Sequence, residues 1–95
     1  MSRQSDSLAD ARLVRRVLAG DEPAFDELVR RHRESVLSVT RGVLDDWDEA
    51  EDAAQEAFLE ALRGLRGLRR GERFRAWLGT IARRSALRRV RRSLY

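Results

Sequence analysis

Carboxylates and arginines are the residues of this chain whose types and spacing could do chemistry, and they occupy different parts of it. Residues 1–62 hold 8 arginines and 15 acids, a net charge of −7, whereas residues 63–95 hold 12 arginines and 1 acid, a net charge of +11. The charge of the whole chain, +4, conceals this division. Such a split predicts two partners of opposite character, one basic and one a polyanion.

Acids are densest from Asp45 to Glu60, a stretch with eight acids and no base. As a helix of 3.6 residues per turn, it turns one apolar stripe toward a core: Trp47, Ala50, Ala54, Phe58, Ala61, Leu62 and Leu65. Its other face is a carboxylate ridge: Asp48, Glu49, Asp52, Gln55, Glu56 and Leu59. Because no arginine follows these acids at helical spacing before Arg63, we expect the ridge to dock on a basic partner. The simpler alternative is a solvated face whose acids favour the helix dipole.

A basic, glycine-rich stretch follows, with glycines at positions 64, 67 and 71. Glycine loosens a backbone, and arginine suits bidentate contacts with phosphate. The stretch therefore predicts a flexible loop that could bind a strand of phosphates through Arg66, Arg69, Arg70 and Arg73. The alternative is a solvated connection between two helices.

The final helix is expected to start near Glu72 or Arg73 and to bury one face: Phe74, Trp77, Leu78, Ile81 and Ser85. Beyond Ser85 the apolar stripe breaks. We therefore expect the last turns to project from the core as a basic rod that offers arginines to phosphates: Arg83, Arg84, Arg88, Arg89, Arg91 and Arg92. A frayed end is the alternative. Arg75 and Trp77 are further candidates for DNA contacts, although the spacing of Trp77 favours packing.

Two helices are expected before the acidic one. Residues 1–7 are polar and are expected to be flexible, and residues 8–95 form one domain. The first helix uses Leu8, Ala11, Val14 and Leu18 as its apolar stripe and stops at Gly20. Asp21 then caps the second helix, whose long apolar face includes His32. As the only histidine, His32 is expected to be a packed or rim residue rather than a ligand.

Several classes of function are disfavoured by composition. The chain has no cysteine and one histidine, so neither thiol chemistry nor a histidine cluster is available, and no catalytic group has a partner base. We expect no enzyme activity, no metal and no cofactor. No apolar run reaches the roughly 20 residues of a membrane span, and the first ten residues lack a signal peptide's apolar centre. The expected location is the cytoplasm.

Two runs of sequence carry a resemblance to a known family. Residues 48–59, DEAEDAAQEAFL, and residues 73–83, RFRAWLGTIAR, resemble region 2 of the sigma-70 superfamily, and more narrowly its extracytoplasmic-function (ECF) group. The opening residues 20–32, GDEPAFDELVRRH, fit the earlier helices of the same domain, so the resemblance covers roughly residues 11–92. It implies an all-α, compact bundle of about four helices, here with a projecting basic C-terminal helix.

The resemblance also implies partners and roles. The ridge residues would dock on the beta-prime clamp helices of core RNA polymerase. The loop and the final helix would read the nontemplate strand of the minus-ten promoter element and capture a flipped base, with the loop arginines at the pocket and Arg83, Arg84 and Arg88 on the backbone. Arg91 is a further predicted DNA contact. The sequence departs from the family at Arg84, where many members have asparagine, and it carries no helix-turn-helix domain for the minus-thirty-five element.

Two other functions stay open. The chain could be an interaction domain bound mainly by an anti-sigma factor or another regulator, without reading DNA itself. A basic amphipathic helix lying on an anionic membrane is less well supported, because residues 73–95 lack a sustained apolar face.

Overall fold

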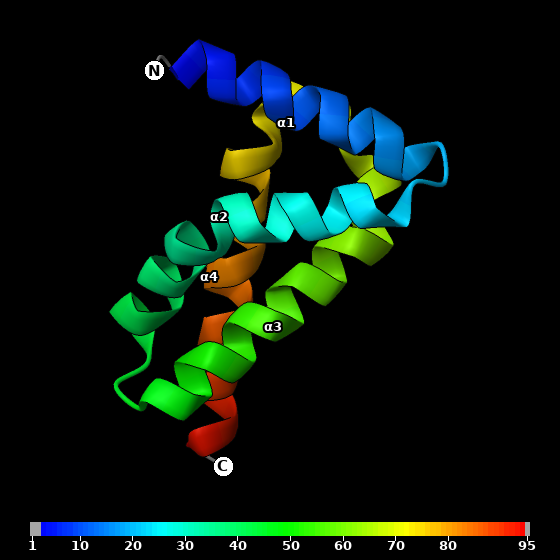
Figure 1. Cartoon of the computed structure of the whole chain (residues 1–95). Helices are drawn as coiled ribbons and strands as arrows, with labels where there is room; N and C mark the ends of the chain where they lie inside the picture. The colour runs from blue at the N-terminus through cyan, green and yellow to red at the C-terminus, as the bar shows by residue number, and fades with distance from the viewer. Residues whose placement is uncertain (1–2, 95) are drawn as a thin grey trace.

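Four α-helices make up most of residues 3–94, the part of the chain that the computed structural model describes, without the side chains of residues 3, 4 and 93. They are α1 (Arg3–Leu18), α2 (Glu22–Val43), α3 (Trp47–Gly64) and α4 (Phe74–Ser93). Two 3-10 turns, η1 (Leu65–Gly67) and η2 (Gly71–Arg73), connect α3 to α4. Helix α1 crosses one end of the bundle, and α4 passes behind α2 and α3 (Figure 1). The predicted all-α bundle is confirmed.

Local signals set the helix boundaries. Gly20 has a φ of 103°, a left-handed conformation that glycine adopts without strain, and it ends α1 as predicted. Asp46 precedes α3 and its carboxylate accepts a hydrogen bond from the backbone N–H of Glu49 at 3.1 Å. Asp21 occupies the predicted cap position of α2, but its carboxylate pairs with Arg16 at 2.7 Å instead of capping the helix.

Helix α1 begins at Arg3, earlier than the sequence predicts. The first turns are attached to α2, because Arg31 contacts the carboxylates of Asp6, at 3.7 Å, and Asp10, at 3.1 Å. The sequence predicts a flexible segment over residues 1–7; the structure describes residues 3–7 as the first turns of α1, and residues 1 and 2 lie outside the described residues.

The centre of the bundle consists of large apolar side chains that the helical patterns identify: Leu28, Val36, Leu65, Phe74 and Leu78. Four other members of the predicted stripes are exposed instead: Leu8 (51%), Leu18 (44%), Trp47 (54%) and Leu62 (43%). They lie in the outer turns of α1 and α3. A helical pattern gives the direction of the buried face, but it does not say how far the neighbouring helices extend along it.

The end of α4 stays packed against α3, so the predicted projecting rod is wrong. The buried stripe continues beyond Phe74 through small residues, and Ala82, Ser85 and Ala86 are fully buried. The hydroxyl of Ser85 donates to the carbonyl oxygen of Ala53 at 3.0 Å. A second apolar cluster then extends the interface, with Leu44, Ala50, Ala53 and Ala86 at its centre and Val43 and Val90 beside it. Small residues on both helices let them approach closely, and their low hydrophobicity hides this face in the sequence.

The stretch between α3 and α4 packs against α1, whereas the sequence predicts a loose loop. Leu65 is 1% exposed, and η2 lies against α1. A Cβ added to Gly71 would lie 2.9 Å from the Cα of Ala11, which is closer than real Cβ atoms come to backbone. Gly71 is therefore needed for close approach to α1 rather than for flexibility.

Replacing Gly71 with alanine is expected to destabilise the protein by about 1–3 kcal/mol, because the backbone of α1 cannot yield as a flexible side chain could. Thermal unfolding followed by circular dichroism measures the effect. Gly67→Ala is the matched control, since a Cβ there meets nothing within 4 Å. Equal unfolding temperatures for the two variants would show that the loop does not depend on this contact.

Candidate functional site

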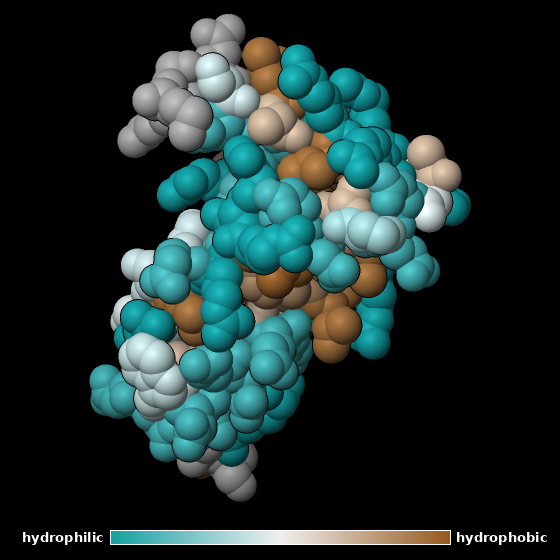
Figure 2. Space-filling view, viewed as in Figure 1, coloured by the Kyte–Doolittle hydropathy of each residue, from teal (hydrophilic) through white to brown (hydrophobic). Residues whose placement is uncertain are grey.

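The acidic face of α3 is divided into an exposed and a paired part. Four of the predicted ridge residues are exposed, and we call this set the acidic strip: Asp48, Asp52, Gln55 and Leu59. Leu59 is 52% exposed, an apolar residue in an otherwise polar surface. In Figure 2 hydrophilic side chains cover the end of the molecule where α3 begins, and hydrophobic side chains reach the surface nearer its other end.

The remaining ridge residues, Glu49 and Glu56, pair with arginines of α4, whereas the spacing of arginines along the sequence predicts almost no partner for the ridge within the chain. Arg89 contacts Glu49 and Glu56, each at 3.2 Å. Arg88 contacts Glu56 at 3.4 Å and forms a shorter ion pair with Glu60. Arg92 approaches Glu56 at 3.7 Å. These pairs, which we call the α3–α4 ion-pair network, join residues between 28 and 40 positions apart, so spacing within one helix could not reveal them.

The network favours the charged forms of two of its members, Glu56 and Arg89. Burial raises the pKa of Glu56, but hydrogen bonds from Arg88 and Arg89 outweigh this effect and hold that pKa below its usual value. Burial lowers the pKa of Arg89, but its hydrogen bonds to Glu49 and Glu56 outweigh burial and raise it. Arg88, which the sequence predicts to contact DNA phosphates, is thus engaged by the carboxylates of Glu56 and Glu60.

Replacing Glu56 with glutamine is expected to lower stability by about 1 kcal/mol at pH 7, or roughly 4–8 °C in unfolding temperature. The pKa of Glu56 is lower in the folded state than in the unfolded state, where it is 4.5. The charged carboxylate therefore contributes its full stabilisation above pH 4.5, and this stabilisation is lost as the pH falls through the pKa of the folded state. The unfolding temperatures of the wild type and of Glu56→Gln should therefore become equal as the pH is lowered from 7 to 3. Asp26→Asn, at an exposed site of α2, controls for net charge. If the difference in unfolding temperature between the wild type and Glu56→Gln did not change with pH, the ion pairs of Glu56 would not be its cause.

A basic pocket forms where the loop meets α4. Its lining residues include no acid: Gly67, Leu68, Arg69, Arg70, Arg73, Ala76, Trp77 and Thr80. The cavity measures about 380 Å³. Trp77 is half-buried, and its ring lies 6.0 Å from that of Phe74, so one side packs on the core while the residue also lines the pocket. An aromatic surface among cations can stack a nucleobase and hold its phosphates.

One of the three pocket arginines has a carboxylate partner. Arg70 donates to Glu72 at 2.7 Å. The backbone N–H of Glu72 and this hydrogen bond lower the pKa of Glu72, which keeps it charged. Arg69 and Arg73 are therefore the pocket cations best suited to a bound anion.

The other predicted DNA-binding arginines are distributed over the surface. Arg66 is exposed in η1 but does not line the basic pocket, and Arg84 and Arg91 are exposed on α4. Arg83 lines a separate groove between α2 and α4. Arg75 lines a third cavity on the α1 side of the bundle, so the structure separates it from the other predicted DNA contacts.

Comparison with known families identifies the domain. A family model for sigma-70 region 2 matches residues 28–93, which include both the acidic strip and the basic pocket. The chain belongs to the sigma-70 region 2 family. Helix α1 lies outside the matched range.

Curated relatives place this region 2 domain in the ECF group. It is 42% identical over 73 residues to the RNA polymerase sigma-H factor of Pseudomonas aeruginosa, covering 77% of this chain and 38% of the relative. It is 36% identical over 85 residues to the ECF RNA polymerase sigma factor SigM of Mycobacterium tuberculosis, covering 90% and 43%. It is 40% identical over 78 residues to the ECF RNA polymerase sigma-E factor of Escherichia coli, covering 82% and 40%. The chain thus spans about two fifths of the length of these relatives.

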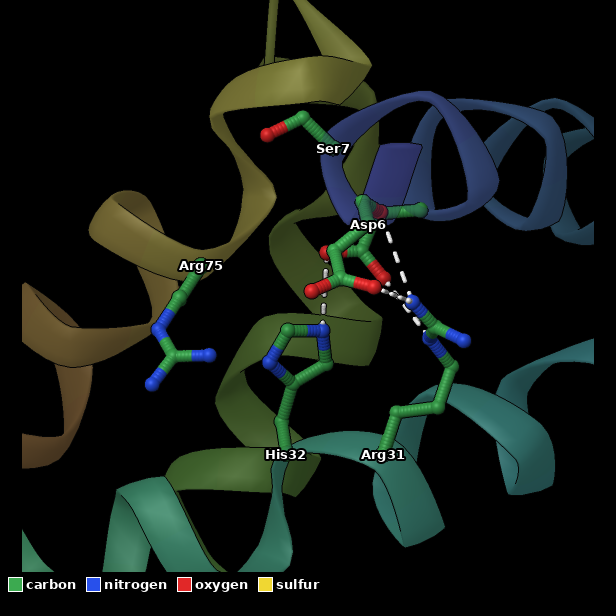
Figure 3. Close-up of a pocket in the computed structure, with 6 residues that line it drawn as sticks. Asp6, Ser7, Arg31, His32 and Arg75 are labelled. Atoms are coloured by element: carbon green, nitrogen blue, oxygen red, sulfur yellow. Dashed lines mark hydrogen bonds and ion pairs between the residues drawn. The ribbon is translucent and has the colours of Figure 1, made fainter. Parts of the chain in front are cut away.

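Region 2 of this chain is joined to α1 by a buried polar contact. Nε2 of His32 lies 2.9 Å from Oδ2 of Asp10, and both side chains are at most 4% exposed. The His32 ring also packs on Phe74, with centroids 5.1 Å apart. The expected packed role of His32 is confirmed, while the burial of Asp10 was not predicted. Figure 3 shows His32 beside Arg31, with Arg75 on the opposite side of His32; Asp10 and all three of these residues line one cavity.

A further feature that sequence reasoning missed lies at the start of α3. The exposed Trp47 ring is covered on one side by the guanidinium of Arg41, 3.8 Å from its centroid, and its Nε1 donates to Glu51 at 3.1 Å. Arg33 completes the arrangement with an ion pair to Glu51 at 3.3 Å. The sequence places Trp47 in the core stripe, but this polar contact holds it at the surface.

Within residues 3–94, no helix combines the length and apolar character that crossing a membrane requires.

Proposed function

We propose that this region 2 domain binds core RNA polymerase through α3 and captures unpaired DNA of the minus-ten promoter element in the basic pocket. The observation that carries the proposal is the pocket itself, which combines Trp77, three arginines and no acid. The relatives' names, all RNA polymerase sigma factors, support the choice of partner.

The acidic strip would supply the polymerase contact. Asp48 and Asp52 are exposed near the N-terminal half of α3, and Leu59 adds an apolar contact farther along the same helix. A protein interface gains affinity from such an apolar residue and gains orientation from the charges around it. The beta-prime clamp helices are the partner that family membership suggests.

The basic pocket would act on DNA by holding one base outside the helix. Removing a base from the stack costs a few kcal/mol, and stacking on an aromatic ring returns about 1–3 kcal/mol. Arg69 and Arg73 would hold the neighbouring phosphates, and exposed arginines of α4, Arg84 and Arg91, would extend this contact. Since stacking on Trp77 requires a base that has left the duplex, binding would favour the melted promoter.

Fluorescence anisotropy tests the proposal, with labelled nontemplate single strands and matched duplexes, with and without core polymerase, across a salt series. We expect a sequence-dependent preference for the single strand, lost in Arg69→Ala with Arg73→Ala. Arg12→Ala with Arg63→Ala removes the same charge from exposed sites away from the pocket and should retain the preference. If all sequences bound equally, the basic surface would attract DNA only by general electrostatics and would not read the minus-ten element.

A second function is favoured by the apolar residues that α3 exposes. Trp47 and Leu62 lie outside the acidic strip yet are 54% and 43% exposed. A regulator such as an anti-sigma factor could bind them and mask the DNA surface. Loss of DNA binding on mixing with the regulator, reversed by Leu62→Asp, would favour this function.

A further inference from the structure

A groove between α2 and α4 adjoins the basic pocket and has no role in the function proposed so far. In Figure 1 the second half of α2 and α4 lie side by side, and packing between them confirms this. The groove encloses about 520 Å³, within the usual size range of ligand sites, and shares Ala76 and Thr80 with the basic pocket. Both helices line it: Ser38, Val39, Gly42 and Val43 from α2, and Ala76, Gly79, Thr80 and Arg83 from α4.

Two glycines keep this groove open. Gly79 lies inside α4, where glycine is less favourable than any residue except proline, and Gly42 lies in the last turn of α2. Neither has the positive φ that would require glycine. A Cβ added to either position would meet nothing within 4 Å, so no neighbouring helix requires the missing side chain. Within the chain these glycines have no structural reason, and their effect is to leave space between α2 and α4.

The lining chemistry fits a nucleotide. Arg83 is the only charged residue of the groove, and no acid lines either the groove or the basic pocket. Val39 and Val43 offer an apolar wall for the flat face of a base. The hydroxyl of Thr80 donates to the carbonyl oxygen of Ala76 at 3.2 Å, which leaves its oxygen to accept a hydrogen bond from a base edge.

We propose that the groove is a second nucleotide subsite, in which a base next to the one held in the basic pocket lies between α2 and α4. The DNA strand passes over Ala76 and Thr80, which line both the basic pocket and the groove. Arg83 contacts the phosphate of the nucleotide in the groove. The inference rests on the proposed function, because it takes the basic pocket to hold single-stranded DNA.

Gly79→Leu and Gly79→Ala form a matched pair that tests the subsite. Both new residues favour helix, so the pair differs mainly in the volume placed in the groove. Each variant is mixed with core polymerase and titrated with a short nontemplate oligonucleotide that fills only the basic pocket, and with a longer one that extends beyond it. We expect Gly79→Leu to weaken binding of the longer strand about tenfold and to leave the short strand unchanged, whereas Gly79→Ala, which adds a single methyl group, should weaken the longer strand by much less than Gly79→Leu does.

Single abasic nucleotides in the longer strand locate the affected base on the unaltered protein. One position should lose about tenfold in affinity, and there Gly79→Leu should add no further loss, since both changes remove the same contact. Gly42→Leu fills the groove from the other helix and should reproduce the result if Gly79→Leu fails to fold.

Three results would overturn the inference. Unchanged binding of the longer strand by a folded leucine variant would show that the groove is empty, while the proposed function stands. Weaker polymerase binding with unchanged DNA affinity would assign the groove to a protein contact. Failure of the unaltered domain to bind any single strand with polymerase present would remove both the subsite and the proposed function.

Discussion

Replacing Asp48 and Asp52 with arginine is expected to weaken binding to core RNA polymerase about a hundredfold or more. Each reversal removes an attraction to a basic surface and adds a repulsion, and two tenfold losses correspond to about 3 kcal/mol. Both side chains are exposed. The fold should therefore remain unchanged, and the loss should become smaller at high salt.

The choice of these two residues follows from the α3–α4 ion-pair network. Reversing Glu56 would place a fourth cation among Arg88, Arg89 and Arg92 and would damage the helix interface along with any docking surface. Asp48 and Asp52 carry no such structural contact among those found in the described part of the chain.

Binding to immobilised core polymerase across a salt series measures the effect, and circular dichroism melts report on the fold. Asp26→Arg with Glu34→Arg is the matched control, because it makes the same change in charge at exposed sites of α2. If both double variants bind equally, the acidic strip is a solvated surface and the polymerase contact lies elsewhere.

Replacing Phe74 with alanine is expected to destabilise the protein by about 3–5 kcal/mol, or roughly 20 °C in unfolding temperature. Phe74 is fully buried at the start of α4 and packs on both His32 and Trp77. A domain of this size has only about 5–10 kcal/mol of stability, so the variant would be close to unfolding at physiological temperature.

Chemical and thermal unfolding measure this loss, and Leu62→Ala is the control. Leu62 is 43% exposed, so its truncation should change stability by less than about 0.5 kcal/mol. The unfolding temperature of Phe74→Ala should fall. The molecules that remain folded should still bind DNA with the same salt dependence as the wild type. A loss below 1 kcal/mol would mean that the core around α4 rearranges to fill the space.

The predictable parts of the candidate site are those that are close in sequence. Arg69, Arg70, Arg73 and Trp77 lie within nine residues, and one short connection followed by one helical turn brings them together. The exposed members of the acidic strip, from Asp48 to Leu59, share a face of a single helix for the same reason. Residues this close are placed by backbone geometry, which the sequence pattern reflects directly.

Local sequence patterns were therefore enough to predict the helical class, the stop at Gly20, the acidic face of α3 and the basic character of the region after it. Which charges remain available depends instead on how the helices pack. Arg88 and Arg89 pair with Glu49, Glu56 and Glu60 because α3 and α4 approach through alanines, and no single-helix pattern shows that approach. The burial of Asp10 beside His32, and the groove that Gly42 and Gly79 both line, likewise depend on how two different helices meet. The rotation and crossing of helices depend on all their packed side chains together, whereas the helical period depends on the local backbone alone.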